Sequence, residues 1–250
     1  MNNHYDLITI GGGSGGLAVA ETAAQHGKKV AIIETYKMGG TCVNKGCVPK
    51  KVIWYAANLA HAVDDAKHFG IPARRGNTDW QKLILARENY IRNITSYWDN
   101  YVSDNGIHHI QGHASFIDNK TLQVNNKTYT AEHVVIATGG QPVTPDLPGA
   151  ELGISSDGFF KLQQQAENIA IIGGGYIGVE LSCVLQALGS NVTLFALENQ
   201  LMHQFDSMPG QALMNEMQTQ GIHLHLNFEV STLEKTAEPR QATIGENKAS

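Results

Sequence analysis

The sequence predicts an α/β protein with two β-α-β units, each of which supports a parallel sheet. Residues 5–34 pass through a β-branched stretch, a glycine-rich turn, a helical stretch that ends in glycine, and a second stretch that ends in an acid. Residues 168–198 repeat this order. Because parallel strands need a crossover, each repeat fits one β-α-β unit. The 250 residues, 42% of them hydrophobic, suffice for the cores of one or two domains.

The composition excludes several classes of function. A formal net charge of −5 with scattered Lys and Arg argues against a nucleic-acid or membrane-binding surface. Three cysteines are too few for the disulfide scaffold of a secreted domain. The N-terminus lacks the pattern of a signal peptide, and the apolar stretch 169–189 is broken by glycines and carries Glu180. We therefore expect a cytoplasmic protein.

The first unit carries the glycine pattern of a dinucleotide site. Gly11, Gly13 and Gly16 follow the first strand and open the helix. Glycines there permit a tight turn and let the backbone approach a pyrophosphate at the helix N-terminus. Glu34 ends the next strand, at the distance expected for an acid that binds ribose hydroxyls. The strand, helix and acid together favour a dinucleotide site over a turn that is merely rich in glycine.

The second unit repeats the pattern at Gly173, Gly175 and Gly178. Two such turns indicate two dinucleotides, and electron transfer between them is the natural reason for both. A flavin and a nicotinamide fit this arrangement.

The remaining segments connect and extend the two units. Residues 80–102 have the apolar spacing of a long amphipathic helix, and 106–140 read as short strands. Residues 141–150 contain three of the seven prolines and read as a linker. After the second unit, 220–235 suggests a further strand and 237–250 a polar tail. The second domain is therefore expected to be incomplete.

Two cysteines, Cys42 and Cys47, lie in the stretch MGGTCVNKGCVPKK at 38–51. They could bind metal, form a structural staple or carry electrons. In a regular helix this spacing separates Cα atoms by about 8–9 Å, whereas a disulfide needs less than about 7 Å. We therefore expect a loop that runs into a distorted first helical turn. Lys45, Lys50 and Lys51 favour a lowered thiol pKa, and zinc is disfavoured because no second ligand pair has the required spacing.

Several motifs in order resemble the pyridine nucleotide–disulfide oxidoreductases, and most closely the glutathione reductase branch. The motifs are GGGSGGLA, GGTCVNKGCVPKK, ATGG (137–140), GISSDGFF (153–160), GYIGVE (175–180) and FDSM (205–208). The ending CVPKK differs from the CIPSK-like ending typical of dihydrolipoamide dehydrogenase and mercuric reductase. The resemblance implies two Rossmann-like domains of the three-layer ββα type: an FAD-binding domain at 1–145 and a partial NAD(P)-binding domain at 146–250.

The resemblance also implies the electron path and the roles of five residues. Reducing equivalents would pass from NAD(P)H through FAD to a Cys42–Cys47 disulfide and then to glutathione disulfide. Cys47 would be the thiol nearest the flavin and form the charge-transfer thiolate, and Cys42 would attack the substrate. Lys50 would lie by the flavin N5 and pair with Glu180, and Tyr176 would cover the nicotinamide pocket.

Further contacts follow from the same resemblance. FAD contacts are expected from Gly11, Gly13, Ser14, Gly15, Gly16, Glu34, Gly40, Thr41, Thr138 and Gly139. The nicotinamide dinucleotide is expected at Gly173, Gly175, Gly178, Leu197, Glu198 and His203, and the substrate at Ser14, Glu21, Tyr90, Tyr97 and Trp98. No metal is expected.

Departures from the family pattern bear on the two substrates. Leu197 and His203 occupy the positions of two arginines that bind the NADPH 2′-phosphate, next to Glu198, so we expect NADH to be preferred. Glu21 replaces an arginine that meets a glutathione carboxylate. This exchange resembles glutathione amide reductase, because a carboxylate can accept a hydrogen bond from an amide. The alternative is that Glu21 points to solvent and plain glutathione disulfide is bound.

Family members continue well beyond residue 250, with a dimerisation domain that supplies a His–Glu pair to the partner's active site. The resemblance therefore implies a homodimer in the full-length protein and an inactive 250-residue stretch on its own. Two alternatives stay open: another disulfide or metal-ion reductase of the family, like dihydrolipoamide dehydrogenase or mercuric reductase, and a non-catalytic FAD-binding fragment.

Overall fold

The computed structural model describes residues 3–236 and 242–247. Within these residues the chain forms two compact units. The first unit comprises the residues up to Pro49 together with Ala86–Gln141. The second comprises Lys50–Leu85 and the residues from Pro142 onward. Each unit is described by itself below, and the domain assignment at 1–145 and 146–250 stays a prediction.

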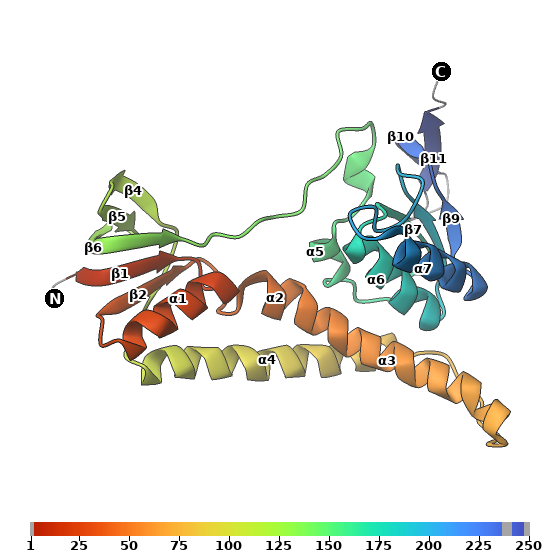
Figure 1. Cartoon of the computed structure of the whole chain (residues 1–250), viewed down its shortest axis with the longest axis horizontal. Helices are drawn as coiled ribbons and strands as arrows, with labels where there is room; N and C mark the ends of the chain where they lie inside the picture. Colours follow the sequence, from red (N-terminus) through yellow and green to blue (C-terminus); the bar gives the residue numbers. More distant parts are fainter. Residues whose placement is uncertain (1–2, 237–241, 248–250) are drawn as a thin grey trace. The chain divides into compact units, whose positions relative to one another are not determined.

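The first unit contains a six-stranded sheet in the order β3-β2-β1-β6-β5-β4. Its strands are β1 (His4–Ile10), β2 (Val30–Glu34), β3 (His108–Gln111), β4 (Ser115–Asp118), β5 (Thr121–Val124) and β6 (Lys127–Ile136). The first three strands and β6 are parallel, whereas β4 and β5 pair antiparallel. β1 is central, with β2 on one side and β6 on the other (Figure 1).

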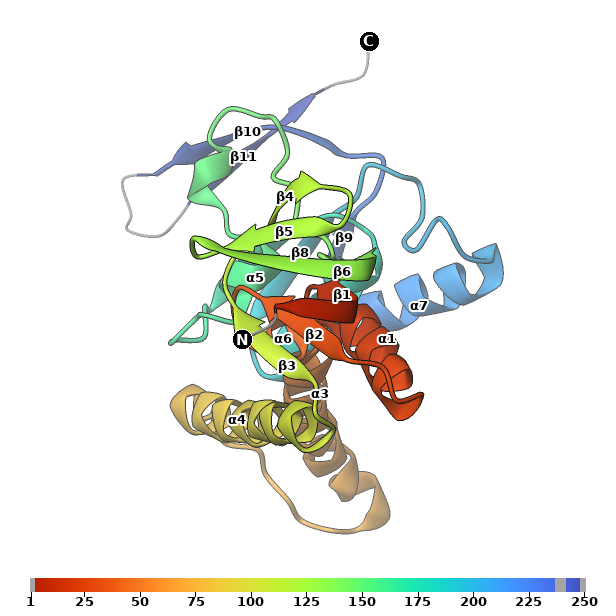
Figure 2. The ribbon, with the colours of Figure 1, turned by 90° about the vertical axis from the view of Figure 1, so that its left-hand side faces the viewer.

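The two faces of this sheet are covered differently. Helix α1 (Ser14–Gln25) packs against β1 and β2, as Figure 2 shows. Leu17 and Ala20 of α1 meet Ile32 of β2 in one buried cluster. On the opposite face, Ile8 and Ile33 lie in a second cluster with residues of β5 and β6. Because side chains alternate along a strand, one face of the sheet is thus packed against a helix and the other carries a separate buried cluster. The arrangement is the Rossmann-like α/β fold that was expected, and the three-layer ββα type stays a prediction.

The cysteine stretch is more helical than predicted. Helix α2 (Gly40–Lys45) contains Cys42, and helix α3 (Cys47–Asp65) begins at the second cysteine. Between them Gly46 has φ −147° and ψ −116°, which are not helical values. The expected distortion is present, but residues 40–45 form a short helix and not a loop. Helix α4 (Trp80–Asp104) confirms the long helix expected at 80–102.

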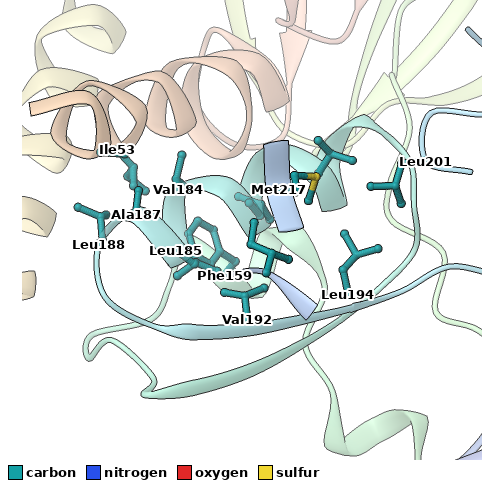
Figure 3. Packing of buried hydrophobic residues seen from close by; sticks show 14 of the residues in the cluster. Ile53, Phe159, Val184, Leu185, Ala187, Leu188, Val192, Leu194, Leu201 and Met217 are labelled. Carbon is teal, nitrogen blue, oxygen red and sulfur yellow. The ribbon is translucent and has the colours of Figure 1, made fainter. Parts of the chain in front are cut away.

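The second unit contains a three-stranded parallel sheet in the order β7-β8-β9. It is built from β7 (Asn168–Ile172), α6 (Tyr176–Ala187), β8 (Asn191–Phe195), α7 (Ser207–Thr219) and β9 (His223–His225). Val184 and Leu185 of α6, Leu194 of β8 and Met217 of α7 form its core together with Ile53 of α3 (Figure 3). This β-α-β unit confirms the prediction for 168–198.

Short elements complete the second unit. They are η1 (Ala66–Phe69), η2 (Ala150–Leu152), α5 (Ser156–Phe159), β10 (Glu229–Lys235) and β11 (Ala242–Asn247). The last two pair antiparallel. A polar tail without a further strand was expected at 237–250, but residues 242–247 of it form a strand that pairs with the edge of β10. Residues 237–241 and 248–250 of that tail lie outside the described residues.

Candidate functional site

The glycine turn of the first unit is shaped by close backbone contacts. Gly11 has φ +112°, and a Cβ there would lie 2.2 Å from the carbonyl oxygen of Ala137. A Cβ on Gly16 would lie 1.8 Å from the carbonyl oxygen of Gly11. Ser14 and Gly15 are exposed, and a Cβ on Gly15 would meet nothing within 4 Å. The turn is therefore tight inside and open at the N-terminus of α1, which fits a pyrophosphate.

Glu34 is held at the end of β2 by two backbone groups. Its Oε2 accepts a hydrogen bond of 2.7 Å from the Gly12 N–H, and its Oε1 accepts one of 2.7 Å from the Tyr36 N–H. Each carboxylate oxygen keeps acceptor capacity for a further donor. The side chain is thus fixed beside the glycine turn, where a ribose of a bound dinucleotide would present hydroxyls.

Two further segments reach the same turn. The Gly39 N–H donates to the carbonyl oxygen of Gly12 at 2.8 Å, so the start of α2, with Gly40 and Thr41, lies against the turn. Gly40 has φ +57°, and a Cβ there would lie 2.7 Å from the Cα of Gly13.

The segment after β6 is the second segment that reaches the glycine turn. The Ala137 N–H donates to the Ile10 carbonyl oxygen at 2.8 Å. Thr138 and Gly139, both exposed, therefore follow directly beside the end of β1. The structure thus brings all the predicted FAD-contacting residues of the first unit together beside the carboxyl ends of its parallel strands.

Cys42 and Cys47 are both free thiols. Cys42 is half-buried and Cys47 is exposed. Burial raises the pKa of the Cys42 thiol above its ordinary value, and a hydrogen bond with Cys47 raises it further. The two side chains are thus neighbours across the break at Gly46. The prediction of a lowered thiol pKa is wrong for Cys42.

Two of the three lysines that were expected to lower this pKa lie against aromatic rings. The Lys45 ammonium lies 5.9 Å from the centre of the Tyr36 ring. The Lys51 ammonium lies 3.4 Å from the centre of the Trp54 ring. Positive charge engaged in such contacts is less available to stabilise a thiolate.

Lys50 and Glu180 form the ion pair that the sequence predicted. Within the second unit, Nζ of Lys50 lies 2.6 Å from Oε1 of Glu180. The side chains are 22% and 40% exposed, so both remain accessible to a ligand. Lys50 lies in the first turn of α3 and Glu180 in the second turn of α6.

The second glycine turn resembles the first. Gly178 has no room for a side chain, because a Cβ there would lie 2.1 Å from the carbonyl oxygen of Gly173. Gly175 precedes α6 as its N-cap, and a Cβ on it would meet nothing within 4 Å. Tyr176 is the first residue of α6 and is 60% exposed. The open helix N-terminus fits a pyrophosphate, and the exposed ring is free to move over a ligand.

The loop after β8 carries the residues expected at the 2′-position of the nucleotide. Leu197 is exposed. Oε1 of Glu198 lies 3.4 Å from Nδ1 of His203, with side chains 36% and 46% exposed. The loop from 196 to 206 contains no Lys or Arg.

The predicted substrate residues all lie in the first unit. A further residue of that unit, Tyr101, contacts Glu21 among them. The hydroxyl of Tyr101 donates a hydrogen bond to Oε1 of Glu21, which also accepts one from Gln25 at 3.3 Å. Glu21 is thus anchored to α4, and the alternative of a carboxylate pointing freely to solvent is wrong. Sequence reasoning missed Tyr101, although it lies one helical turn after Tyr97 on the same face.

Tyr101 joins the predicted aromatic residues into one cluster. Its ring centre lies 5.8 Å from that of Tyr97 and 5.7 Å from that of Trp98. Tyr90, which is exposed, lies two helical turns before Tyr97, and Ser14 is exposed at the start of α1. The cluster and the carboxylate form a surface of mixed aromatic and acidic character.

Among residues 3–236 and 242–247, no group of three or more His, Cys, Asp or Glu side chains could hold a metal ion. In the same part of the chain, none of the helices combines the length and apolar character that crossing a membrane requires.

Comparison with known proteins gives a family match over nearly the whole sequence. The family model described as pyridine nucleotide-disulphide oxidoreductase matches residues 5–250. The glutathione reductase of Schizosaccharomyces pombe is 41% identical over 241 residues, which are 92% of this chain and 52% of that protein. The glutathione reductase of Yarrowia lipolytica is 40% identical over 235 residues, 88% of this chain and 50% of that protein. The chain thus spans about half the length of these relatives.

Solved structures agree with the fold. The HOCl-induced flavoprotein disulfide reductase RclA of Escherichia coli superposes with a TM-score of 0.84 at 28% sequence identity. The superposition covers 98% of this chain and 54% of that protein. The Cu(II) complex of a cysteine-to-serine mutant of the same reductase gives a TM-score of 0.85 at 27% identity, over 100% of this chain and 54% of that one.

Proposed function

Since the chain belongs to the pyridine nucleotide–disulphide oxidoreductase family, we propose that its protein is a flavoprotein that reduces glutathione disulfide or its amide. Electrons pass from a nicotinamide dinucleotide through FAD to the Cys42–Cys47 pair. The observation that carries this proposal is the hydrogen-bonded pair of thiols at a helix break, on a segment that begins against the first glycine turn. FAD, when bound, supplies the electron pair that returns the oxidised cysteines to thiols.

The two cysteines divide the thiol exchange between them. The deprotonated Cys42 sulfur attacks one sulfur of the substrate, which forms a mixed disulfide and releases the first thiol product. Cys47 then attacks the Cys42 sulfur, which forms the Cys42–Cys47 disulfide and releases the second thiol. The dithiol loses two electrons and two protons, which the two products gain.

Because the pKa of Cys42 is raised, the first attack needs a base to remove its proton. We assign this base to the His–Glu pair of a dimerisation domain, which the partner subunit supplies, so the active form is a homodimer. We place this homodimer in the cytoplasm. To Lys50, which pairs with Glu180 at 2.6 Å, we assign the stabilisation of negative charge on the flavin ring. To Tyr176, the first residue of α6, we assign the covering of the nicotinamide.

NADH is the proposed electron donor. The loop that would meet a 2′-phosphate has no Lys or Arg and carries Glu198. A dianionic phosphate placed near this carboxylate is repelled, whereas the ribose hydroxyls of NADH can donate to it.

The proposed substrate is the amide of glutathione disulfide, because Glu21 offers a carboxylate at the proposed substrate site. Its carboxylate is held by Tyr101 and Gln25 and can accept a hydrogen bond from a substrate amide. A substrate carboxylate at the same place would be repelled.

The test uses the complete FAD-loaded protein. We expect a yellow protein that develops long-wavelength absorption on reduction, and Cys47→Ser abolishes that absorption. Turnover of the amide disulfide should exceed that of the plain disulfide, and Glu21→Arg should reverse the order. A yellow protein without the absorption band would support a non-catalytic flavin-binding protein, and turnover only with another disulfide or a metal ion would support a different branch of the family.

A further inference from the structure

The two glycine turns are joined to their sheets by equivalent backbone hydrogen bonds. In the first unit the Gly11 N–H donates to the carbonyl oxygen of Ile33 at 2.8 Å. In the second unit the Gly173 N–H donates to that of Phe195 at the same distance. Ile33 and Phe195 therefore hold equivalent positions, each at or next to the end of its strand.

A second pair of hydrogen bonds ties the following loop to each turn. Gly39 donates to the carbonyl oxygen of Gly12 at 2.8 Å, and Met202 donates to that of Gly174 at 2.9 Å. Gly39 has φ +96° and Met202 φ +56°, so both bend the chain in the left-handed region. The loop after β8 thus returns to its own glycine turn at Met202 and places His203 immediately afterwards.

The acid of the first unit has no counterpart at the equivalent position of the second. The residue after Ile33 is Glu34, whereas the residue after Phe195 is Ala196. Ala196 is buried, and its Cβ lies 2.9 Å from where a Cβ of Gly174 would be. The equivalent position therefore carries no carboxylate. The acid of this loop is Glu198, two residues later, in contact with His203.

The Glu198–His203 pair contributes a charge to the loop surface that depends on the protonation of His203. With neutral His203 the pair carries the charge of Glu198 alone, and with protonated His203 it carries none. The 3.4 Å separation joins the two groups directly, and both stay partly exposed. The other titratable groups nearby in the fold are Asp206, the N-cap of α7, and His225 of β9, whose ring stacks on Phe195.

We infer that the Glu198–His203 pair determines the choice between NADH and NADPH as a function of pH. This inference rests on the proposed nicotinamide site. At alkaline pH the unneutralised Glu198 disfavours a 2′-phosphate. At acidic pH the imidazolium of His203 neutralises Glu198 and offers an N–H donor to the phosphate, so the discrimination against NADPH weakens.

Two nucleotide fragments test the inference without any redox reaction. The complete protein is titrated with 2′,5′-ADP and with 5′-AMP at about pH 6 and pH 8, which bracket a histidine titration. The affinity ratio of 2′,5′-ADP to 5′-AMP should rise about fivefold on acidification beyond the rise seen in His203→Gln, as expected for one exposed charge pair. Glu198→Gln should raise this ratio at the higher pH.

The variants distinguish the effect of protonating His203 from the effect of protonating the 2′-phosphate of the ligand. The 2′-phosphate itself titrates near pH 6 and contributes equally in all variants. His68→Gln, which removes an exposed histidine of η1, is the matched control and should behave like the unsubstituted chain. An equal acid response in His203→Gln and in the unsubstituted chain would overturn the inference, while binding of both fragments would still support the nucleotide site. If neither fragment binds, the nucleotide site and the inference both fail.

Discussion

The hydroxyl of Tyr101 on α4 donates a hydrogen bond to the carboxylate of Glu21 on α1. The two residues lie far apart in the sequence, and this contact turns a surface glutamate into a fixed acceptor beside an aromatic cluster. The pKa of Tyr101 is raised, first by this hydrogen bond, so the phenol keeps its proton in the presence of the carboxylate.

Removing the Tyr101 hydroxyl should weaken substrate discrimination. In the complete protein, Tyr101→Phe frees Glu21 from a charge-assisted bond, and we expect the ratio of kcat/KM for the amide over the plain disulfide to fall about tenfold. Tyr55→Phe, an exposed tyrosine of α3 with no assigned role, is the control and should keep the ratio. An unchanged ratio in Tyr101→Phe would show that the hydroxyl does not position Glu21 for the substrate.

The raised pKa of Cys42 predicts slow alkylation at neutral pH. Because a raised pKa leaves less thiolate, the iodoacetamide reaction of Cys42, followed by mass spectrometry, should accelerate only above the ordinary thiol range. Cys47→Ala removes a neighbour that raises this pKa, so the acceleration should begin at lower pH. Cys183, half-buried with a pKa raised first by burial, is the internal control and should react slowly in both proteins. A Cys42 that reacts fully as thiolate at neutral pH would contradict the prediction.

The Lys50–Glu180 ion pair should matter more for electron transfer than for stability. Lys50→Met removes a partly exposed pair, so the free energy of unfolding should change by less than about 1 kcal/mol. Under the role proposed for Lys50, flavin reduction by NADH, measured by stopped flow in the complete protein, should slow at least about tenfold, because the charge assigned to stabilise the reduced flavin is removed. Lys51→Met is the matched control, since this lysine lies over Trp54. A rate equal to that of the control would rule out the role assigned to Lys50.

Two neighbouring glycines should respond differently to alanine. Gly16→Ala places a methyl group 1.8 Å from the Gly11 carbonyl oxygen, so the apo protein should lose about 1–3 kcal/mol of stability along with FAD binding. Gly15→Ala meets no protein atom within 4 Å. Its apo stability should be unchanged, and only FAD affinity should fall. Thermal unfolding with and without added FAD distinguishes the two effects, and equal apo stability in both variants would contradict the first.

Local patterns in the sequence predicted much of the fold. Both β-α-β units and the long helix follow from periodicity and glycine placement, which depend on neighbouring residues. The strand at 242–247 was missed because its stabilisation comes from pairing with β10 and not from its own composition.

The candidate site was predictable where a motif fixes the backbone and less so where distant side chains meet. The Lys50–Glu180 contact follows from the resemblance of both motifs to the family. Tyr101 could not be linked to Glu21 from spacing alone, since their contact depends on how α4 packs beside α1. The raised pKa of Cys42 was also missed, because the burial of its thiol and its contact with Cys47 depend on the fold and cannot be read from the charges of neighbouring residues.

The non-helical backbone of Gly46 lies between the two cysteines, so the conformation of this one residue bears on how easily their thiols can form a disulfide. In an unbroken helix Cys42 and Cys47 would be held too far apart to bond, about 8–9 Å at Cα. Two helices that meet at a glycine can approach or separate by turning about that residue, and a Cβ there would lie 3.0 Å from the Thr41 carbonyl oxygen. We therefore expect a single methyl group at Gly46 to strain the backbone between Cys42 and Cys47, and so to change how easily the two thiols are oxidised although both cysteines are retained.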